Sequence, residues 1–551
     1  MKEMKKISGK RVDLVLKSIN EVEIVIENGK IQSITECENA TEQYLIPGLV
    51  DAHIHIESSM MPPTEFARHA MAHGTVACVC DPHEIANVCG VAGIDYMIND
   101  AKNSPLKFYF GAPSCVPATA FDAAGAVLDA KIVTELLKRD DIHFLAEVMD
   151  YVAVTNANAD MMQKIAAAHA HAKVIDGHAP NISNNVLAKY VENGISTDHE
   201  CMNLQEALEK IALGMKILIR EGSAAKNFDD LVDLLGMHPA HVMFCSDDKH
   251  PDDLLLNGHI DTLARRAIAA GFDIFDVLRA CSMNPIQHYK LNVGMLQVGD
   301  AADFLIVDNL QDINIKATYI GGEECFNAKL PKTKWQKPSL INNFEANAIN
   351  VSQIAVPHID NSNIKVIDIT DGQLYTKSST AKPLVQSGEI VSDIENDVLK
   401  IVQYNRYTRN AKPSVAFVRN FGLKQGALAS SIAHDSHNII AIGTSDAEIA
   451  AAINIIIGAK GGVVATKKGQ YELLALPIAG LMSDLPGEAV AAQYQKVDAL
   501  AKTLGCQLHA PFMTMAFMSL VVMPELKLGD KGLFDGFKFE YISLQTDDEV
   551  K

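Results

Sequence analysis

The chain has 551 residues, too many for a single ordinary hydrophobic core, so two or three domains are expected. Hydrophobic residues make up 48% and charged residues 21%, as in soluble globular proteins, and no run of about eighteen apolar residues predicts a membrane span. The net charge of −20 opposes binding to nucleic-acid phosphates, so the expected partner is a small molecule.

The start of the chain, MKEMKKISGK, lacks the apolar segment of a secretion signal. Ten cysteines are scattered along the sequence and none forms a C-x-x-C pair. This usage predicts reduced thiols in a cytoplasmic protein. A homo-oligomer is the expected assembly, as for many large cytoplasmic enzymes.

The first 47 residues read as short strands joined by turns, with Asn28-Gly29 as a hairpin turn. A similar pattern returns in VGDAADFLIVD (298–308) and ATYIGG (317–322). We therefore predict one composite β-domain built from both flanks of a central unit, covering residues 1–47 and 290–340.

Between the flanks, residues 48–289 alternate strand-like runs with helix-like segments, which predicts parallel βαβ units. Eight runs suggest an α/β fold of the (β/α)8 TIM-like barrel class. The eight runs are LVDAHIHIE (49–57), TVACVCD (75–81), KFYFGAPS (107–114), HFLAEVM (143–149), KVIDGHAP (173–180), GISTDHE (194–200), KILIREGS (216–223) and HVMFCSDD (241–248).

Polar side chains that bind metals gather near the carboxyl ends of these runs, where barrels of this class place their active sites. A helical bundle or a solenoid gives no reason for that placement. The residues concerned are His53, His55, Asp81, Glu147, His178, His199 and Asp247.

Residues 345–551 form a third region with strand-like runs and Ala-rich helices, predicted to be an α+β C-terminal domain. Its segment AHDSHN (433–438) is typical of a turn with side-chain caps, the alternative being a roof over the substrate pocket. The Gly-rich IIIGAKGGVVA (455–465) lacks the Lys-Ser/Thr of a P-loop, which disfavours nucleotide binding.

The two histidines of the H-x-H motif, His53 and His55, point to the same side if the motif lies on a strand. On a helix they would diverge by roughly 200°, given about 3.6 residues per turn. A second H-x-H, His169 and His171, lies in the Ala-rich MMQKIAAAHAHA and is predicted to be helical, without a role in the site. The motif alone is therefore weak support for a metal site.

The partners of the first motif strengthen the prediction. His178 and His199 end two further strands, and Glu147 and Asp247 end two more, where an unpaired buried carboxylate would be costly. Four histidines with two carboxylates suit two divalent ions that share a bridging carboxylate and hydroxide.

Two other pairs are candidates for binding or proton transfer. Asp81 and His83 in CDPHE are predicted to deliver a proton to the substrate or to orient it, while Asp81-Pro82 also fits a helix entry. Arg220 and Glu221, at the end of the seventh run, are weaker substrate-pocket candidates, and an internal ion pair explains them equally well.

These motifs resemble the amidohydrolase superfamily, whose members carry H-x-H on strand 1, a bridging carboxylate or carboxylated lysine on strand 4, histidines on strands 5 and 6, and an aspartate on strand 8. PGLVDAHIHIES, EVMD, DGHAP, STDHE and CSDD stand in those places and in that order. The resemblance covers roughly residues 10–325 and implies a metal-dependent hydrolase.

A narrower resemblance, along the whole chain, is to the bacterial adenine deaminase family, carried by DAHIHIESSMM, CDPHEIANVCG and FCSDDKHP. It implies hydrolysis of adenine to hypoxanthine and ammonia by a metal-bridged hydroxide. Manganese or iron, with zinc possible, would be held by His53, His55 and Asp247 on one side and by His178 and His199 on the other, with Glu147 bridging. Spacing alone leaves Asp247 and Asp248 open, and the resemblance favours Asp247. It also implies that the catalytic residues are Asp247, Glu147, Asp81 and His83.

Three alternative functions compare with these motifs as follows. A cyclic-amide hydrolase of the hydantoinase or dihydroorotase kind commonly has a lysine as the strand-4 bridge, where HFLAEVMD offers Glu147. A cytidine-deaminase-type zinc enzyme needs H-x-E with P-C-x-x-C, and Cys78-Val79-Cys80 has the wrong spacing. A non-catalytic scaffold relative would typically have lost ligands, whereas all six ligand positions are filled.

Overall fold

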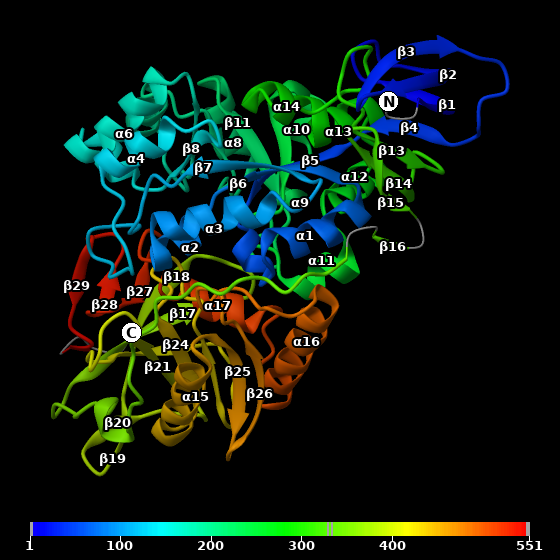
Figure 1. Cartoon of the computed structure of the whole chain (residues 1–551). Helices are drawn as coiled ribbons and strands as arrows, with labels where there is room; N and C mark the ends of the chain where they lie inside the picture. The colour runs from blue at the N-terminus through cyan, green and yellow to red at the C-terminus, as the bar shows by residue number, and fades with distance from the viewer. Residues whose placement is uncertain (1–3, 328–329, 332–333, 547–551) are drawn as a thin grey trace.

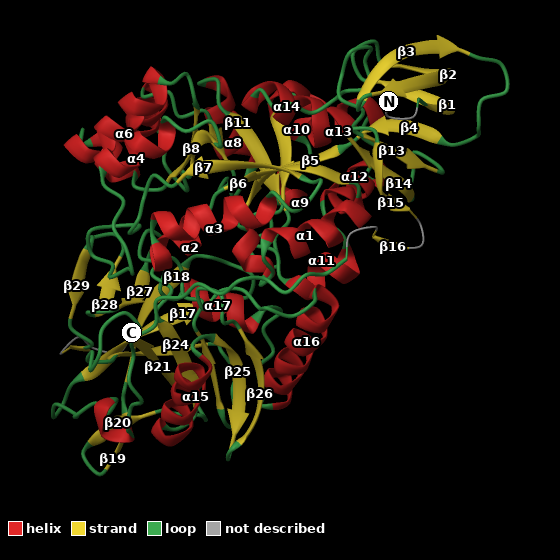
Figure 2. Cartoon of the chain, viewed as in Figure 1, coloured by secondary structure: helices red, strands yellow, loops and turns green. Residues whose placement is uncertain are grey.

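The computed structural model describes residues 4–327, 330–331 and 334–546. Three sheet-based regions follow one another in space, with the β-rich flank at one end, the barrel in the middle and the C-terminal region below it (Figures 1 and 2). Among the described residues, no helix has both the length and the apolar character needed to cross a membrane.

The two flanks of the chain form one eight-stranded sheet, as predicted. Asn28 and Gly29 form the two-residue hairpin loop between its second and third strands, with φ of 52° and 78°, the left-handed values that Asn-Gly favours. The strand Tyr44–Pro47 pairs in parallel with Lys5–Asp13 and in antiparallel orientation with Phe304–Val307. These two pairings join the flanks. The strands are β1 (Lys5–Asp13), β2 (Ser18–Glu27), β3 (Lys30–Glu36), β4 (Tyr44–Pro47), β13 (Phe304–Val307), β14 (Ile315–Ile320), β15 (Glu323–Asn327) and β16 (Leu330–Pro331).

All eight predicted runs of the central unit contain a strand. They are β5 (Leu49–Ile54), β6 (Thr75–Cys80), β7 (Lys107–Ala112), β8 (Ile142–Val148), β9 (Val174–Gly177), β10 (Thr197–Asp198), β11 (Lys216–Arg220) and β12 (Val242–Cys245). Their residues are mostly buried Val, Ile, Leu, Phe and Cys, as expected for parallel strands covered on both faces.

The strands form parallel sheets of five and three members, and two parallel bridges connect these sheets. Ile54 pairs with Asp247, which joins the first strand to the last, and Ile175 pairs with Ile195, which joins the fifth to the sixth. The ring is therefore closed, and the predicted TIM-like barrel is confirmed.

Helices surround the barrel (Figure 2). His169 lies in the last turn of one of them and contacts the backbone oxygen of Asn193, and His171 is the residue that caps the same helix at its C-terminus. The second H-x-H motif therefore lies at a helix end and not on a strand. The helices are α1 (Pro63–Ala70), α2 (His83–Cys89), α3 (Val91–Ala101), α4 (Ala130–Leu137), α5 (Tyr151–Thr155), α6 (Ala159–Ala170), α7 (Asn184–Glu192), α8 (Leu204–Ala212), α9 (Phe228–Leu231), α10 (Leu234–Met237), α11 (Pro251–Asn257), α12 (Ile260–Ala269), α13 (Ile274–Leu278) and α14 (Asn284–Tyr289).

The C-terminal region is built on a nine-stranded sheet, against which α15 (Asp446–Ala459) and α16 (Gly487–Thr503) pack. α17 (Pro511–Phe517) lies between this sheet and the barrel (Figure 1). The strands of the sheet are β17 (Asn363–Ile369), β18 (Thr376–Ala381), β21 (Val398–Tyr404), β22 (Ser414–Arg419), β23 (Ala427–Ser430), β24 (Ile439–Gly443), β25 (Gly462–Lys467), β26 (Gln470–Ala475) and β30 (Gln545–Thr546).

Two small additions complete this region. They are the hairpin of β19 (Leu384–Gln386) and β20 (Glu389–Val391), and the three-stranded sheet of β27 (Leu526–Gly529), β28 (Gly532–Asp535) and β29 (Glu540–Ile542).

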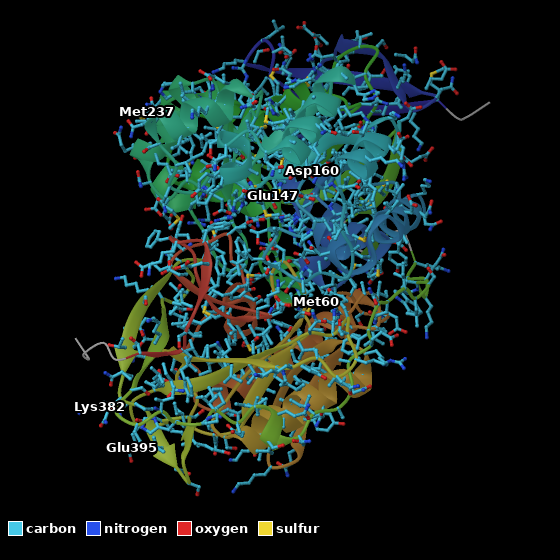
Figure 3. All side chains as sticks on the ribbon, turned by 90° about the vertical axis from the view of Figure 1, so that its left-hand side faces the viewer. Met60, Glu147, Asp160, Met237, Lys382 and Glu395 are labelled. Atoms are coloured by element: carbon cyan, nitrogen blue, oxygen red, sulfur yellow. The ribbon has the colours of Figure 1, made fainter. Side chains whose placement is uncertain are left out.

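The barrel and the C-terminal region share one buried apolar core. The largest apolar cluster contains Ile56 and Met60, from the loop after the first barrel strand, together with Phe512 and Met513 of α17. Figure 3 shows Glu147 in the interior of the barrel half and Lys382 and Glu395 at the far end of the C-terminal region. The carboxyl end of the barrel is thus covered by protein.

Candidate metal centre and substrate pocket

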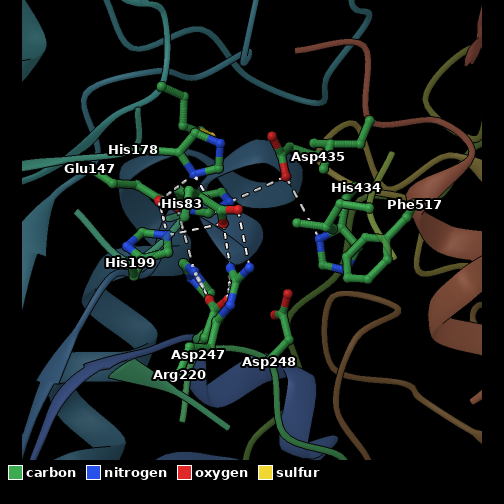
Figure 4. A pocket seen from close by; sticks show the side chains of 15 residues that line it. His83, Glu147, His178, His199, Arg220, Asp247, Asp248, His434, Asp435 and Phe517 are labelled. Carbon is green, nitrogen blue, oxygen red and sulfur yellow. Dashed lines mark hydrogen bonds and ion pairs between the residues drawn. The ribbon is translucent and has the colours of Figure 1, made fainter. Parts of the chain in front are cut away.

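The predicted ligands from five barrel strands converge at the carboxyl end of the barrel, where all are buried. Figure 4 shows four of them, Glu147, His178, His199 and Asp247. His53 Nε2 and His55 Nε2 lie 3.1 Å apart, and Asp247 Oδ1 lies 3.6 Å and 3.2 Å from them. Asp247, and not Asp248, therefore contacts the H-x-H pair. These three side chains form the first ligand group.

The second ligand group consists of His178 and His199. Their Nδ1 and Nε2 atoms, respectively, each lie 3.1 Å from Glu147 Oε2. The other oxygen of this carboxylate, Oε1, faces the first group and lies 3.5 Å from His55 Nε2. Glu147 thus offers one oxygen to each group, which is the geometry of a bridging carboxylate.

The charges of the site stabilise these carboxylates as anions. Burial raises the pKa of Glu147, but hydrogen bonds with His178 and His199 lower it more and hold it well below its usual range. Burial also raises the pKa of Asp247, but the positive charge of Arg220 and the hydrogen bonds with His53 and His55 together hold it well below its usual range.

The donor set fits divalent cations. His53 and His55 direct two ring nitrogens at each other at 3.1 Å, an arrangement that a shared cation satisfies better than one shared proton. Within the described part of the chain, His178 Nε2 is a buried nitrogen with no hydrogen-bond partner. Imidazole nitrogens mixed with carboxylate oxygens suit Mn²⁺, Fe²⁺ and Zn²⁺.

His83 lies next to Glu147, on the side of its Oε1 atom, and Asp81 lies next to His83. His83 Nδ1 is 3.4 Å from Glu147 Oε1 and 3.1 Å from Asp81 Oδ2. Asp81 Oδ1 also accepts a hydrogen bond from the backbone N–H of His83, the first residue of α2. The helix-entry and pocket interpretations of this segment thus describe the same residues.

Arg220 and Glu221 have separate surroundings. Arg220 donates to Asp247 Oδ2 at 2.7 Å and also pairs with Glu200, so its guanidinium is both an internal ion pair and part of the pocket wall. Glu221 instead pairs with Lys226 and Arg266 and does not line the pocket.

Sequence reasoning missed Glu200. Its Oε1 atom lies 3.4 Å from His199 Nε2 and 3.7 Å from His178 Nδ1. Strand alternation would send neighbouring side chains to opposite sides. β10 ends at Asp198, however, so His199 and Glu200 lie in the loop that follows and both face the cavity.

The C-terminal region closes the cavity from the opposite side (Figure 4). His434 and Asp435 lie in a turn, as predicted, but they face the pocket, so the roof interpretation describes their side chains. Asp435 Oδ1 is 3.4 Å from His83 Nε2, a contact between residues 352 positions apart. Leu374, Phe517 and Leu520 add an apolar surface to the roof.

The space between the barrel and this roof is small, about 30 Å³ as traced by the centres of a water-sized sphere. A polymer would not fit under the roof, so the space favours a small ligand. Polar groups line the barrel side and apolar groups much of the roof, which suits a flat heterocycle with hydrogen-bonding edges.

Comparison with known proteins agrees with this geometry. Residues 44–325 match the amidohydrolase family, and residues 373–540 match the adenine deaminase C-terminal domain. The chain is 50% identical to the adenine deaminase of Methanosarcina mazei over 99% of its own length and 100% of that protein. It is 47% and 45% identical to the adenine deaminases of Salinibacter ruber and Borreliella burgdorferi, over 98% of its length and 99% of theirs.

The similarity therefore covers both the barrel that carries the ligand groups and the region that forms the roof. The chain belongs to the adenine deaminase family of the amidohydrolases.

Proposed function

We propose that this protein hydrolyses adenine to hypoxanthine and ammonia with two divalent ions held in the barrel. The observation that carries the proposal is the placement of Glu147, whose two oxygens each face one of the two ligand groups. The named relatives supply the substrate, because each is an adenine deaminase along its full length.

In this proposal His53, His55 and Asp247 would hold one ion, His178 and His199 would hold the other, and the carboxylate of Glu147 would be shared between them. Bound divalent ions lower the pKa of water from about 15.7 towards about 7 and so supply hydroxide at neutral pH. We propose Mn²⁺ or Fe²⁺, with Zn²⁺ as the alternative.

The protein's own residues move the protons. Asp247 Oδ2 is held by Arg220, which leaves Oδ1 to accept a proton from the attacking water. Burial lowers the pKa of His83, but the charge of Asp81 and the contact with Asp435 raise it well above its usual value. His83 therefore retains a proton that it can donate to the purine ring beside C6.

The oxygen of water adds to C6, and the bond from C6 to the exocyclic nitrogen breaks. The proton that Asp247 accepted from water passes to this nitrogen, which leaves as ammonia. The apolar roof excludes bulk water, which strengthens the electrostatic interactions within the cavity. We further propose that residues 1–47 with 290–340, residues 48–289, and residues 345–551 are three domains, of which the second and the third meet at this site.

The test is an absorbance assay of metal-supplied protein on adenine, adenosine and a cyclic amide, together with analysis of bound metal. We expect turnover of adenine and about two ions per chain. Hydrolysis of the cyclic amide without turnover of adenine would contradict the proposal. Protein that binds no metal when expressed with manganese or iron would be a scaffold.

A further inference from the structure

A buried pair beneath the ligand groups, Asp51 and His259, lies at the seam where the first and last barrel strands meet. We propose that this pair is a positioning device for the metal centre, which sets the places of His53 and Asp247. The inference rests on the proposed metal-dependent function and adds two residues that touch neither substrate nor metal.

Asp51 holds both strands at once. It precedes His53 by two positions on β5, so its side chain points to the same side of the strand, one layer deeper in the barrel. Its Oδ1 atom accepts the backbone N–H groups of His53 at 3.3 Å and Ser246 at 3.1 Å, and its Oδ2 atom accepts the Ser246 hydroxyl. One carboxylate thus connects residues 195 positions apart.

His259 is the partner that fixes this carboxylate. Its Nε2 atom lies 2.8 Å from Asp51 Oδ2, and both side chains are completely buried. Its Nδ1 atom is 2.6 Å from the hydroxyl oxygen of Thr75, the first residue of β6. The Nε2 contact has an ion-pair distance without the alignment of a hydrogen bond. When Nδ1 accepts the Thr75 hydroxyl proton, Nε2 carries the ring proton.

Asp247 needs such support because its backbone lies in the left-handed region, with φ of 52°. Residues other than glycine rarely adopt this conformation. The Asp247 peptide is held to β5 by two hydrogen bonds, from Asp247 N to His53 O at 3.0 Å and from His55 N to Asp247 O at 3.2 Å. Asp51 accepts hydrogen bonds from Ser246, the residue before Asp247, and from His53. It therefore holds both strands at the point where these two peptide hydrogen bonds form.

A purely structural role would make the pair matter for stability alone. A positioning role predicts that metal affinity falls as well, because the ligand atoms of His53 and Asp247 would no longer be preset. Partners behind metal ligands typically contribute about 10- to 100-fold in affinity. Lys400 and Asp446, a buried ion pair in the C-terminal region, provide a comparison remote from the seam.

The experiment titrates metal-free full-length protein with Mn²⁺ and measures the dissociation constant, alongside urea unfolding and kcat and KM for adenine. We expect His259→Leu to weaken Mn²⁺ binding about 10- to 100-fold, and His259→Gln, which retains a donor and an acceptor, to weaken it by less. Lys400→Met should lower stability and leave the Mn²⁺ dissociation constant unchanged.

Wild-type Mn²⁺ affinity in His259→Leu would overturn the inference. If that variant does not fold, Thr75→Val removes only the hydroxyl. Weaker Mn²⁺ binding by folded Thr75→Val would then support the inference, and unchanged binding would overturn it. Neither result bears on the proposed function, which depends on adenine turnover by the unaltered protein.

Discussion

Glu147 is the single residue whose chemistry the proposed centre depends on most. Replacing it with glutamine exchanges one carboxylate oxygen for an NH₂ group, which cannot ligate a cation, so one ligand group loses its shared oxygen. We expect Glu147→Gln to lose at least one ion per chain and to lower kcat/KM by more than about 100-fold, beyond the usual effect of residues behind the ligands. Metal analysis and the adenine assay measure both quantities.

The matched control for this substitution is Glu135→Gln, on the outer helix α4, where the side chain is 63% exposed. It should keep both the metal content and the rate. Full metal content together with full activity in Glu147→Gln would show that the bridging assignment is wrong.

Lys527 is a second residue with a measurable signature. It is fully buried in β27 and donates to the carbonyls of Leu374 at 2.6 Å and Phe517 at 3.0 Å, so it holds the backbone of two roof residues. Burial lowers the pKa of its amine from 10.5 to about 7. Below about pH 7, Lys527 is protonated in both the folded and the unfolded chain.

Between about pH 7 and 10.5 the unfolded chain binds a proton at Lys527 that the folded protein lacks, so this group makes the free energy of unfolding rise with pH. The slope is up to about 1.4 kcal/mol per pH unit. Lys527→Met should remove this contribution. Urea unfolding of both proteins at several pH values measures it, and parallel pH profiles would contradict the prediction.

At the scale of elements, the barrel was predictable because its strands are short apolar runs that end in polar residues. Strand periodicity distinguished the H-x-H at His53 from the one at His169. The structure places His53 on β5 with His55 just past its end, and His169 in the last turn of α6. The roof was only the alternative interpretation of AHDSHN, and its contacts with the barrel could not be predicted. The contact between His83 and Asp435 joins residues 352 positions apart, and no local pattern encodes such a contact.

Gly177 shows how tightly two elements meet beside the site. It ends β9, immediately before His178, and a Cβ atom there would lie 2.4 Å from the backbone oxygen of Thr197 in β10 and 2.7 Å from Ile195. Gly177→Ala should therefore push the two strands apart. We expect unfolding to become easier by about 1–3 kcal/mol, the usual cost of overpacking.

His178 would move with β9, so metal content should fall as well. The comparison is Gly458→Ala in α15, where an added Cβ meets no atom within 4 Å and helix propensity favours alanine. Denaturant unfolding and metal analysis of the two variants test the difference. Equal stability of Gly177→Ala and the parent would contradict the predicted clash.

For the whole molecule, the site depends on how the C-terminal region docks on the barrel. Glu65 on α1 accepts the backbone N–H of Gly487 at 2.6 Å, at the start of α16, and Arg68 pairs with both Glu65 and Glu488. Ser483 donates to the carbonyl oxygen of Met60, in the loop that follows the first ligand strand. The docking surface therefore adjoins the chain segment that carries His53 and His55.

Gly487 lies at a tightly packed point of this interface. A Cβ atom there would lie 2.3 Å from His69 Nε2 and 2.6 Å from Met61 Sδ, so Gly487→Val should separate α16 from α1 and lift the roof from the cavity. The ligands come from the barrel alone, and metal content should remain at the parent value. Adenine would be held less closely, and we expect kcat/KM to fall about 10- to 100-fold, as displacements near 1 Å can cause.

Glu488→Gln, with the acidic side chain 59% exposed, is the mild control at the same interface. Unchanged kcat/KM in Gly487→Val would mean that catalysis does not need the roof, and loss of metal would mean that the C-terminal region supports the ligands themselves.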